Sequence, residues 1–327
     1  MRRLFIIVMV LSTLYGGYWF VGARAVEDGA RDALADMADQ GWDVAFSDLD
    51  TRGFPSRFDT TVTDLSLTAP SGLLSYQAPF LQAFALSYQP NRVIAAFPTT
   101  QTVRLGGLTL MLGSDGLRAS AGVKANAGLS FDEATVEAKM LSLATDVAGV
   151  RTGPALLATR ASAMPNAYDA YLGLERITLP DDLWQQMFPH GALPLTIDGL
   201  RLDATATLDQ ELNRNTLQAN PGPVLTALKL TELVLNWGDL SVTARGALDV
   251  DQSGVVSGKI TITAVAWEDL LEGLSNVGAI EPDIAQTYRN MGDLLAQGSE
   301  TLTVPLTFQN GFMTLGAIPL GLAPRLR

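Results

Sequence analysis

A run of twenty uncharged residues near the N-terminus constrains this chain more than any other feature of its sequence. The run extends from Leu4 to Ala23. As a helix with a rise of about 1.5 Å per residue it is about 30 Å long, which matches the hydrocarbon core of a bilayer. Arg2 and Arg3 precede it, and the positive-inside tendency keeps such an end in the cytoplasm. The sequence therefore predicts a membrane anchor over residues 1–23, with the rest of the chain exported.

A cleaved signal peptide is the alternative interpretation of the same segment. The Ala-Arg-Ala sequence at 23–25 has the small-x-small pattern of a cleavage site, but the apolar run is long for a signal peptide. Tyr15, Tyr18 and Trp19 lie near its outer end, where amphipathic rings favour the membrane interface. We expect a single-pass protein of a bacterial inner membrane with most of its chain in the periplasm. In the alternative, the domain is released into the periplasm after cleavage.

The composition argues against several classes of function. The net charge is -12, and phosphate backbones repel such a surface, so nucleic-acid binding is not expected. The chain has no cysteine, which removes disulfides, thiolate nucleophiles and cysteine-ligated metals. Only 17% of the residues are charged and glycine is frequent, which favours many short strands and tight turns over a charged helical bundle.

Hydrophobic periodicity divides the exported part into a helix and a β-rich domain. Over residues 24–41 apolar side chains recur at helical spacing until Gly41, which predicts a connecting helix. From Trp42 the period changes to two, and the Gly-Phe-Pro sequence at 53–55 marks a turn between strands. Residues 42–327 are therefore predicted to form the exported β-rich domain. The Ala-rich stretch 145–165 is ambiguous between helix and loop, and it is the expected seam if the domain has two lobes.

One apolar pattern recurs along the predicted strands, with spacings of two, then three, then two residues. An extra residue would turn the following side chains to the other face, and a β-bulge absorbs it while bending the strand. We therefore expect long strands that are kinked near their centres; chance is the alternative, because leucine is common. The copies are Val103-Leu105-Leu108-Leu110, Leu172-Leu174-Ile177-Leu179, Leu195-Ile197-Leu200-Leu202, Leu228-Leu230-Leu233-Leu235 and, in part, Val62-Leu65-Leu67.

Turn and helix signals complete the predicted architecture. Helices are expected at 181–188, 267–274 and 282–295, the last with Ile284, Tyr288, Met291 and Leu295 on one face. The predicted fold is mainly β (α+β): a large curved antiparallel sheet or partly open barrel with bulged strands, a few amphipathic helices and an N-terminal transmembrane helix. Three turns predict hairpins: Ser114-Asp115-Gly116 between 108–112 and 117–123, Gln252-Ser253-Gly254 between 247–250 and 255–263, and Asn310-Gly311 between 302–308 and 312–315.

Motifs at both ends of the predicted domain resemble a bacterial family catalogued as domain of unknown function 2125. They are Trp42-Asp43-Val44 with the turn at 53–55, Gly246-Ala247-Leu248 with Gly254 and Gly258, and the closing stretch 306–324. The similarity covers most of the chain after the anchor, and no activity or ligand comes with it. More distantly, the anchor and the apolar pattern resemble AsmA-like envelope proteins. That resemblance implies a curved sheet with an apolar groove and a role in lipid handling.

Side chains that carry catalysis are scarce. His190 is the one histidine, and between a proline and a glycine it is expected to be a solvated turn residue, so neither a histidine triad nor a histidine zinc cluster is expected. Asp181 and Asp182 are expected to stabilise the start of a helix. We predict no catalytic, cofactor-binding or metal-binding residue, although a glycosidase-type carboxylate pair could lie among Asp198, Asp203, Asp249 and Asp251.

Aromatic residues concentrate in the first third of the chain and supply the remaining candidate site. By strand alternation, Phe80, Phe84, Leu86 and Tyr88 share one face. Core packing is the ordinary role of such side chains, and a wall of an apolar ligand groove is the functional one. We take these four residues as the candidate groove.

Three functions follow from these observations. The leading hypothesis is a binding role, in which the anchored domain holds or passes a lipid or another hydrophobic envelope component. The alternative is a non-catalytic structural or assembly protein that docks envelope proteins. A carboxylate-dependent hydrolase is the third. The expected partners are therefore the membrane, through the N-terminal helix, together with lipid or envelope proteins, and no cofactor is expected.

Overall fold

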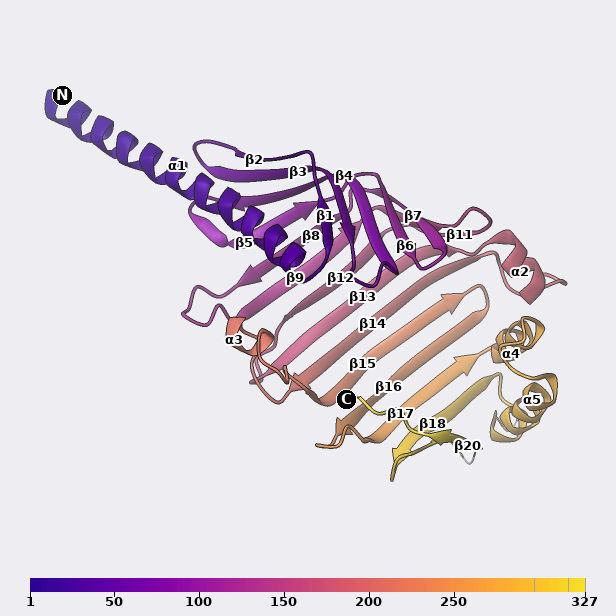
Figure 1. The fold of residues 1–327 in the computed structure, drawn as a ribbon. Helices are drawn as coiled ribbons and strands as arrows, with labels where there is room; N and C mark the ends of the chain where they lie inside the picture. Colours follow the sequence, from indigo (N-terminus) through magenta and orange to yellow (C-terminus); the bar gives the residue numbers. More distant parts are fainter. Residues whose placement is uncertain (297, 317, 327) are drawn as a thin grey trace. The chain divides into compact units, whose positions relative to one another are not determined.

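The structure is a computed structural model that describes residues 1–296, 298–316 and 318–326. These residues form five helices and twenty strands (Figure 1). They fall into two compact units, which we describe separately. Unit 1 comprises Met1–Val123 and Glu137–Val147, and unit 2 comprises Lys124–Val136 and Ala148–Arg327. The predicted class is confirmed: the fold is mainly β and antiparallel, with bulged strands, a few helices and a long apolar helix at the N-terminus.

The N-terminal helix α1 (Arg2–Asp39) is continuous and contains both the predicted anchor and the predicted connecting helix. It ends as expected before Gly41, whose φ is +89°. The apolar side chains of residues 4–14 are at least 52% exposed. By length and composition α1 can cross a membrane, a property that signal sequences share. Figure 1 shows its N-terminal part projecting past strands β2 (Asp48–Arg52) and β3 (Arg57–Thr68).

The sheet of unit 1 is built around β3 and branches at β4 (Leu74–Leu86). Residues 74–77 of β4 pair with one strand, residues 82–86 pair with another, and the two branches then continue separately. All of these pairings are antiparallel. They are β1 (Asp43–Ala45) and β2 with β3, β3 with β4, β4 with β5 (Gln89–Ala96) and β6 (Thr100–Leu105), β5 with β8 (Arg118–Val123), β6 with β7 (Leu108–Asp115), and β7 with β10 (Met140–Ala144).

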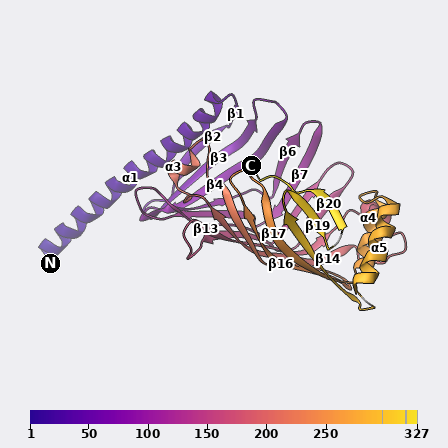
Figure 2. The same ribbon diagram turned by 90° about the horizontal axis from the view of Figure 1, so that it is seen from below.

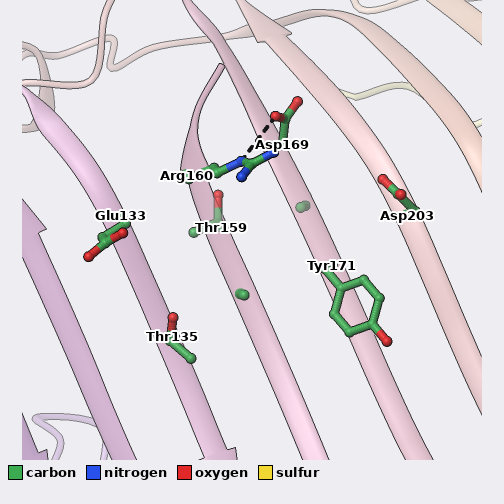
Figure 3. A pocket seen from close by; sticks show the side chains of 9 residues that line it. Glu133, Thr135, Thr159, Arg160, Asp169, Tyr171 and Asp203 are labelled. Carbon is green, nitrogen blue, oxygen red and sulfur yellow. Dashed lines mark hydrogen bonds and ion pairs between the residues drawn. The ribbon is translucent and has the colours of Figure 1, made fainter. Parts of the chain in front are cut away.

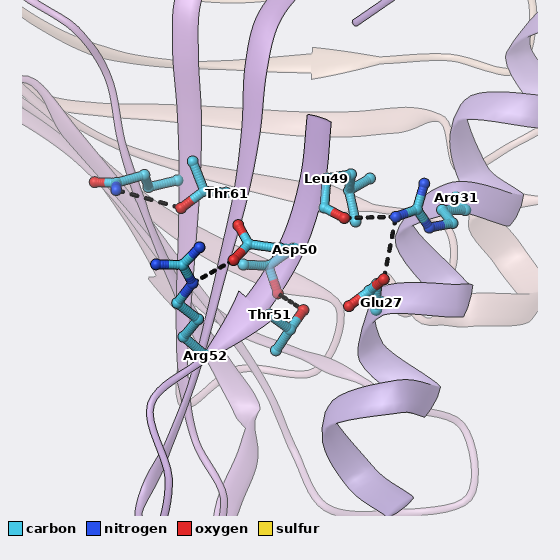
Figure 4. Close-up of polar contacts among 9 residues, drawn as sticks. Glu27, Arg31, Leu49, Asp50, Thr51, Arg52 and Thr61 are labelled. Atoms are coloured by element: carbon cyan, nitrogen blue, oxygen red, sulfur yellow. Dashed lines mark hydrogen bonds and ion pairs between the residues drawn. The ribbon is translucent and has the colours of Figure 1, made fainter. Parts of the chain in front are cut away.

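Helix α1 covers one face of this sheet through two apolar clusters and one polar contact. Arg31 donates hydrogen bonds to the backbone oxygen of Leu49 (2.5 Å) and to Glu27 Oε1 (3.1 Å), which ties the helix to β2 (Figure 4). The first cluster holds Trp19, Ala23 and Phe58, and the second packs Ala30 and Leu34 of the helix against Leu49, Val62 and Leu65 of the sheet. Because Trp19 and Ala23 are 5% and 7% exposed, the predicted anchor contributes to the core of unit 1.

The apolar pattern on β3 reflects a real kink. Phe58, Thr60 and Val62 are buried at a spacing of two, and the next buried residue is Leu65. Asp64, which lies between them, has a φ of +52°. A residue in this left-handed region reverses the facing of the chain. The partial copy of the pattern therefore corresponds to a kink at Asp64 within one continuous strand.

Unit 2 is a long antiparallel meander (Figure 2). Strand β9 (Phe131–Ala138) lies mostly in this unit and pairs with β12 (Ala155–Ala161). A short strand, β11 (Gly149–Thr152), pairs with β13, and from β12 onward each strand pairs with the next. The remaining strands are β13 (Ala167–Thr178), β14 (Thr196–Leu208), β15 (Leu225–Trp237), β16 (Leu240–Val250), β17 (Val256–Val265), β18 (Thr301–Gln309), β19 (Phe312–Leu315) and β20 (Ile318–Leu322).

The apolar pattern takes three different forms in the structure. In β15 it is a bulge: the register with both neighbouring strands shifts at residues 231–232. In β13 it accompanies a backbone reversal at Arg176, whose φ is +49°. At 103–110 the expected kinked strand is wrong, because Leu105 pairs with Leu108 and Gly106-Gly107 form a tight turn between β6 and β7. Two glycines permit the positive φ that such a turn requires, +59° at Gly106.

Two of the three predicted hairpins are confirmed. The turns at 252–254 and 310–311 join β16 to β17 and β18 to β19. The turn at 114–116 does not form a hairpin: β7 pairs on its two sides with β6 and β10, so β8 pairs with β5 instead. The stretch 145–165, expected to be helix or loop, contains β11 and β12. There the pairing with β13 overrides the local preference.

Three predicted helices are present in unit 2: α2 (Asp181–Met187), α4 (Trp267–Asn276) and α5 (Pro282–Ala296). A fourth helix, α3 (Arg214–Leu217), was not predicted. The predicted apolar face of α5 is partly wrong, because Ile284 and Leu295 are exposed and the buried positions are Ala285 and Gly292. The main cluster holds Met187, Phe188, Leu193, Trp237 and Leu240, with Trp184 and Leu270 packed against it.

The turn between β16 and β17 depends on one carboxylate. Asp251 Oδ1 accepts hydrogen bonds from the Ser253 amide (2.7 Å), the Ser253 hydroxyl (2.7 Å) and the Val255 amide (3.0 Å). The Ser253 hydroxyl and the two amides hold the pKa of Asp251 below its ordinary value of 3.8. The stabilisation is therefore present above about pH 4 and is lost as the pH falls through the lowered pKa.

We expect the Asp251→Ala variant to be less stable than the wild type at pH 7, by an amount that shrinks at pH 3. Protonation weakens the same three bonds in the wild type, so the two proteins converge in acid. Urea unfolding of both proteins at the two pH values measures the difference. An equal difference at both values would show that the ionised carboxylate is not what stabilises the turn.

Candidate functional site

The main candidate site is an open hollow of about 450 Å³ on the sheet of unit 1. Its volume is in the range of about 300–1,000 Å³ that small-molecule sites usually have. The walls come from the ends of four strands: β3, β4, β5 and β8. The lining residues are Arg57, Phe84, Ala85, Leu86, Gln89, Arg92, Ile94, Ala96 and Arg118.

Strand register places the apolar residues of the hollow on one face. Phe84 of β4 lies opposite Ile94 of β5, and Ala96 lies opposite Arg118 of β8. Because side chains alternate along a strand, Phe84, Ile94 and Ala96 point to the same side of the sheet. Asp59 also lies on this side, opposite Phe84, whereas the neighbouring Phe58 packs against α1. The hollow and α1 therefore occupy opposite faces of the sheet.

The floor of the hollow is apolar and uncovered. Ile94 is 47% exposed and Leu86 is 36% exposed. Strand β5 is paired on both sides, by β4 and β8, so its backbone is satisfied while its apolar side chains face outward. Exposed apolar groups in the middle of a sheet are the kind of surface that a ligand or partner covers.

Guanidinium groups surround this floor in a chain whose net charge is -12. Arg57 forms an ion pair with Asp59 (2.8 Å), and Arg118 forms one with Glu137 (2.9 Å). The two arginine side chains are 57% and 59% exposed. Glu137 is 50% exposed, and such exposed pairs contribute only about 0–1 kcal/mol, so Arg118 can turn toward an incoming anion at small cost. Asp59 is only 18% exposed, so Arg57 is expected to keep this partner and to offer its remaining N–H groups to the anion. The arrangement suits a molecule with an apolar body and an anionic end.

The structure brings together two of the four predicted groove residues. Phe84 and Leu86 line the hollow, and Phe80 lies further along β4, outside its lining. Tyr88 follows the end of β4 and is 70% exposed. Sequence reasoning missed the arginines, because Arg57 and Arg118 come from strands distant in sequence. The alternation of Arg92, Ile94 and Ala96 is the one local signal that could have indicated a strand face with both a charged and apolar side chains.

A second, more polar hollow of about 300 Å³ lies in unit 2 (Figure 3). Arg160 of β12 forms an ion pair with Asp169 of β13 (3.4 Å), and the Thr205 hydroxyl donates to Asp169 Oδ1 (3.0 Å). Glu133 lies on β9 and Asp203 on β14, with β12 and β13 between them. At about 4.8 Å per strand their backbones are about 14 Å apart.

The other sequence-predicted groups lie apart from both hollows. His190 is exposed in a turn, as predicted. Asp181 and Asp182 lie in the first turn of α2, although no side-chain cap bond forms there. Asp198 accepts a hydrogen bond from the Gly238 amide (2.8 Å), which is a structural contact. Among the described residues, no group of three or more His, Asp or Glu side chains is arranged to hold a metal ion.

Comparison with known proteins places the chain in a family. The model of a bacterial family described as "uncharacterized protein conserved in bacteria (DUF2125)" matches residues 19–324. The chain belongs to this family. The DUF2125 match begins at Trp19, so it includes both buried residues of α1, Trp19 and Ala23, and it contains every residue that lines the two hollows. No curated protein and no solved structure matches the chain.

Proposed function

We propose that this member of the DUF2125 family is an anchored periplasmic protein that binds an anionic amphiphile in the hollow of unit 1. The observation that carries the proposal is the uncovered apolar floor formed by Phe84, Leu86 and Ile94, with arginines around it. An acyl chain fits the floor, and a phosphate or carboxylate head fits the guanidinium groups. The ligand class is therefore a lipid or a fatty acid.

Packing of α1 supports a retained anchor over a cleaved signal peptide. Cleavage near residue 25 would remove Trp19 and Ala23 from the core and expose Phe58. It would also remove the hydrogen bond from Trp19 Nε1 to the Arg57 oxygen (2.8 Å). A segment that completes the core of a folded unit is expected to stay attached. The two arginines at positions 2 and 3 favour a cytoplasmic N-terminus and a periplasmic domain.

We assign binding rather than catalysis to the hollow. Its lining offers guanidinium, amide and apolar groups, and it contains neither a nucleophile nor a general base. A guanidinium group is always protonated at physiological pH, so it can hold an anion without transferring a proton. The proposed activity is therefore the holding or transfer of the amphiphile.

The test compares two substitutions of exposed strand residues in the full-length protein. Ile94→Glu places a carboxylate on the floor of the hollow, whereas Leu157→Glu places one on β12, where Leu157 is 50% exposed. We expect the wild type and Leu157→Glu to retain radiolabelled palmitate or lysophosphatidylglycerol through gel filtration in a neutral detergent. We expect Ile94→Glu to lose at least tenfold in retention, because the charge opposes both the chain and the head.

The two probes separate a fatty acid from a phospholipid as the preferred ligand. Equal retention by Ile94→Glu and Leu157→Glu would show that the lipid is bound elsewhere. If the wild type retains neither probe, the hollow does not bind amphiphiles. The assembly role would then become the leading hypothesis, and crosslinking to envelope proteins would be the next experiment.

A further inference from the structure

Aromatic side chains gather where α1 leaves the sheet of unit 1. Trp19 meets Phe54 edge to face, with ring centroids 5.4 Å apart, and Phe20 stacks on Phe54 at 5.7 Å. Phe54 lies in the turn between β2 and β3. Trp19 is buried, but Phe54 and Phe20 are 56% and 61% exposed. The cluster therefore has an inner part that packs and an outer part that faces away from the sheet.

The position of this turn along α1 places it at membrane depth. A β-carbon added to Gly16 would lie 3.9 Å from the Phe54 ring. Gly16 precedes Ala23, the end of the apolar run, by about 10 Å along the helix axis. If the run from Leu4 to Ala23 spans the hydrocarbon core, Phe54 lies about 10 Å inside the outer boundary. Interfacial apolar groups enter a leaflet to a depth of about 5–10 Å.

A second turn reaches the same part of α1. The Tyr18 hydroxyl donates to the backbone oxygen of Ser87 (2.6 Å), and the Tyr15 hydroxyl bonds the Ser87 hydroxyl (3.0 Å). Ser87 is fully buried, and its neighbour Tyr88 is 70% exposed. Because Tyr15 and Tyr18 lie within the apolar run, the turn between β4 and β5 is held at the depth of the first turn.

The charge around the two turns fits a lipid surface. Residues 53–58 and 86–94 contain no Asp or Glu, and their charged residues are Arg57 and Arg92. Arg57 is paired with Asp59 just outside the first stretch, and its exposed guanidinium group keeps further N–H donors for a lipid phosphate. Aromatic and apolar side chains beside arginines are typical of the membrane interface.

We propose that the turns at 53–56 and 87–88 insert into the outer leaflet around α1, so that unit 1 is held by the bilayer at three points. The occupant of this exposed apolar surface is the membrane itself, because the surface is continuous with the spanning helix. Arg57, Leu86 and Gln89 lie next to the inserted turns in sequence and line the hollow. An amphiphile can therefore enter the hollow from the leaflet without crossing water. The inference rests on the proposed anchoring.

Single-cysteine labelling tests the insertion, since the chain has no cysteine of its own. The full-length protein is reconstituted in phosphatidylethanolamine–phosphatidylglycerol vesicles, with a nitroxide at Phe54→Cys or Tyr88→Cys. Leu11→Cys, in the spanning part, is the membrane control. Leu73→Cys is the aqueous control, because Leu73 is 63% exposed in the turn between β3 and β4, whereas Phe54 precedes the opposite end of β3. The twelve residues of β3 span about 40 Å at 3.3 Å per residue. Power saturation gives the accessibility of each label to oxygen relative to a water-soluble nickel chelate.

We expect this ratio to be at least threefold higher at positions 54 and 88 than at position 73. Tyr88 is largely exposed, so its label keeps the test valid if the substitution of Phe54 disturbs the ring cluster. Labels at positions 54 and 88 with the same accessibility ratio as the label at 73, together with a lipid-exposed label at position 11, would contradict the insertion of the two turns. That result would leave the membrane anchor supported. An aqueous label at position 11 would overturn the anchor and the insertion together.

Discussion

Replacing Trp19 with alanine is expected to lower the free energy of unfolding of unit 1 by about 3–5 kcal/mol, as for other buried Trp or Phe residues. The indole is 5% exposed and packs against Phe58 with ring centroids 6.0 Å apart. Its Nε1 also donates to the backbone oxygen of Arg57, an acceptor that the variant leaves without this partner. A cleaved signal peptide would show no such effect on the mature protein, so the substitution also tests whether the anchor is part of the fold.

Phe20→Ala is the matched control for this experiment. Phe20 is the next residue along α1 and is 61% exposed, so its loss in detergent micelles is expected to cost less than about 1 kcal/mol. Hydrogen–deuterium exchange of the full-length protein, read on peptides from each unit, measures the change. We expect faster exchange in β2 and β3 of Trp19→Ala and little change in unit 2. Indistinguishable exchange in the two variants would show that the helix does not stabilise the sheet.

The second large effect is expected in unit 2. Leu240 is 0% exposed and lies in the cluster with Phe188 and Trp237. Its replacement by alanine leaves a cavity, which is expected to cost about 2–5 kcal/mol. The same cluster joins α2 and α4 to the start of β16, so loss of packing there is expected to loosen the helices together with the strand.

Leu183→Ala on α2 is the control, because Leu183 is 38% exposed and its truncation is expected to cost little. Exchange of peptides from α2, α4 and β16 is expected to rise in Leu240→Ala, with unit 1 protected as in the wild type. Equal loss of protection in both units would instead show that the chain unfolds as one cooperative body. The two substitutions together therefore test the division into units as well as the two cores.

Local sequence signals predicted the elements better than their partners. Three predictions that depend on nearby residues are confirmed: the helix end before Gly41, the turn at Asn310-Gly311 and the helix expected at 267–274. Strand β8 cannot pair with β7 because β10 occupies that edge of β7, and β10 follows β8 by about twenty residues in the chain. Strand β8 pairs with β5 instead. No signal near residue 116 carries that information. The spacing of three residues at 105–108 was ambiguous for a related reason, since a bulge and a two-residue turn give the same apolar pattern.

The candidate site was predictable only in part. Phe84 and Leu86 were found because they alternate on one strand, a pattern that is visible in sequence. Arg57 and Arg118 join them through the pairing of β3 with β4 and of β5 with β8, which the sequence does not show. Tyr88 was placed on the strand because the alternation continues past Leu86, where the register with β5 shifts and the strand ends.

The continuous helix α1 fixes the distance and the rotation between its two contacts with the sheet. Its two contact clusters, at Trp19 and Ala23 and at Ala30 and Leu34, lie on one side of the helix. Inserting one residue between them would rotate the second cluster by about 100° and turn it away from the sheet. The length of residues 15–39 is therefore fixed by packing, whereas residues 4–14 can lengthen or shorten without disturbing the domain. Adaptation to a thicker or thinner bilayer is expected in that first stretch, and the height of the domain above the membrane would stay constant.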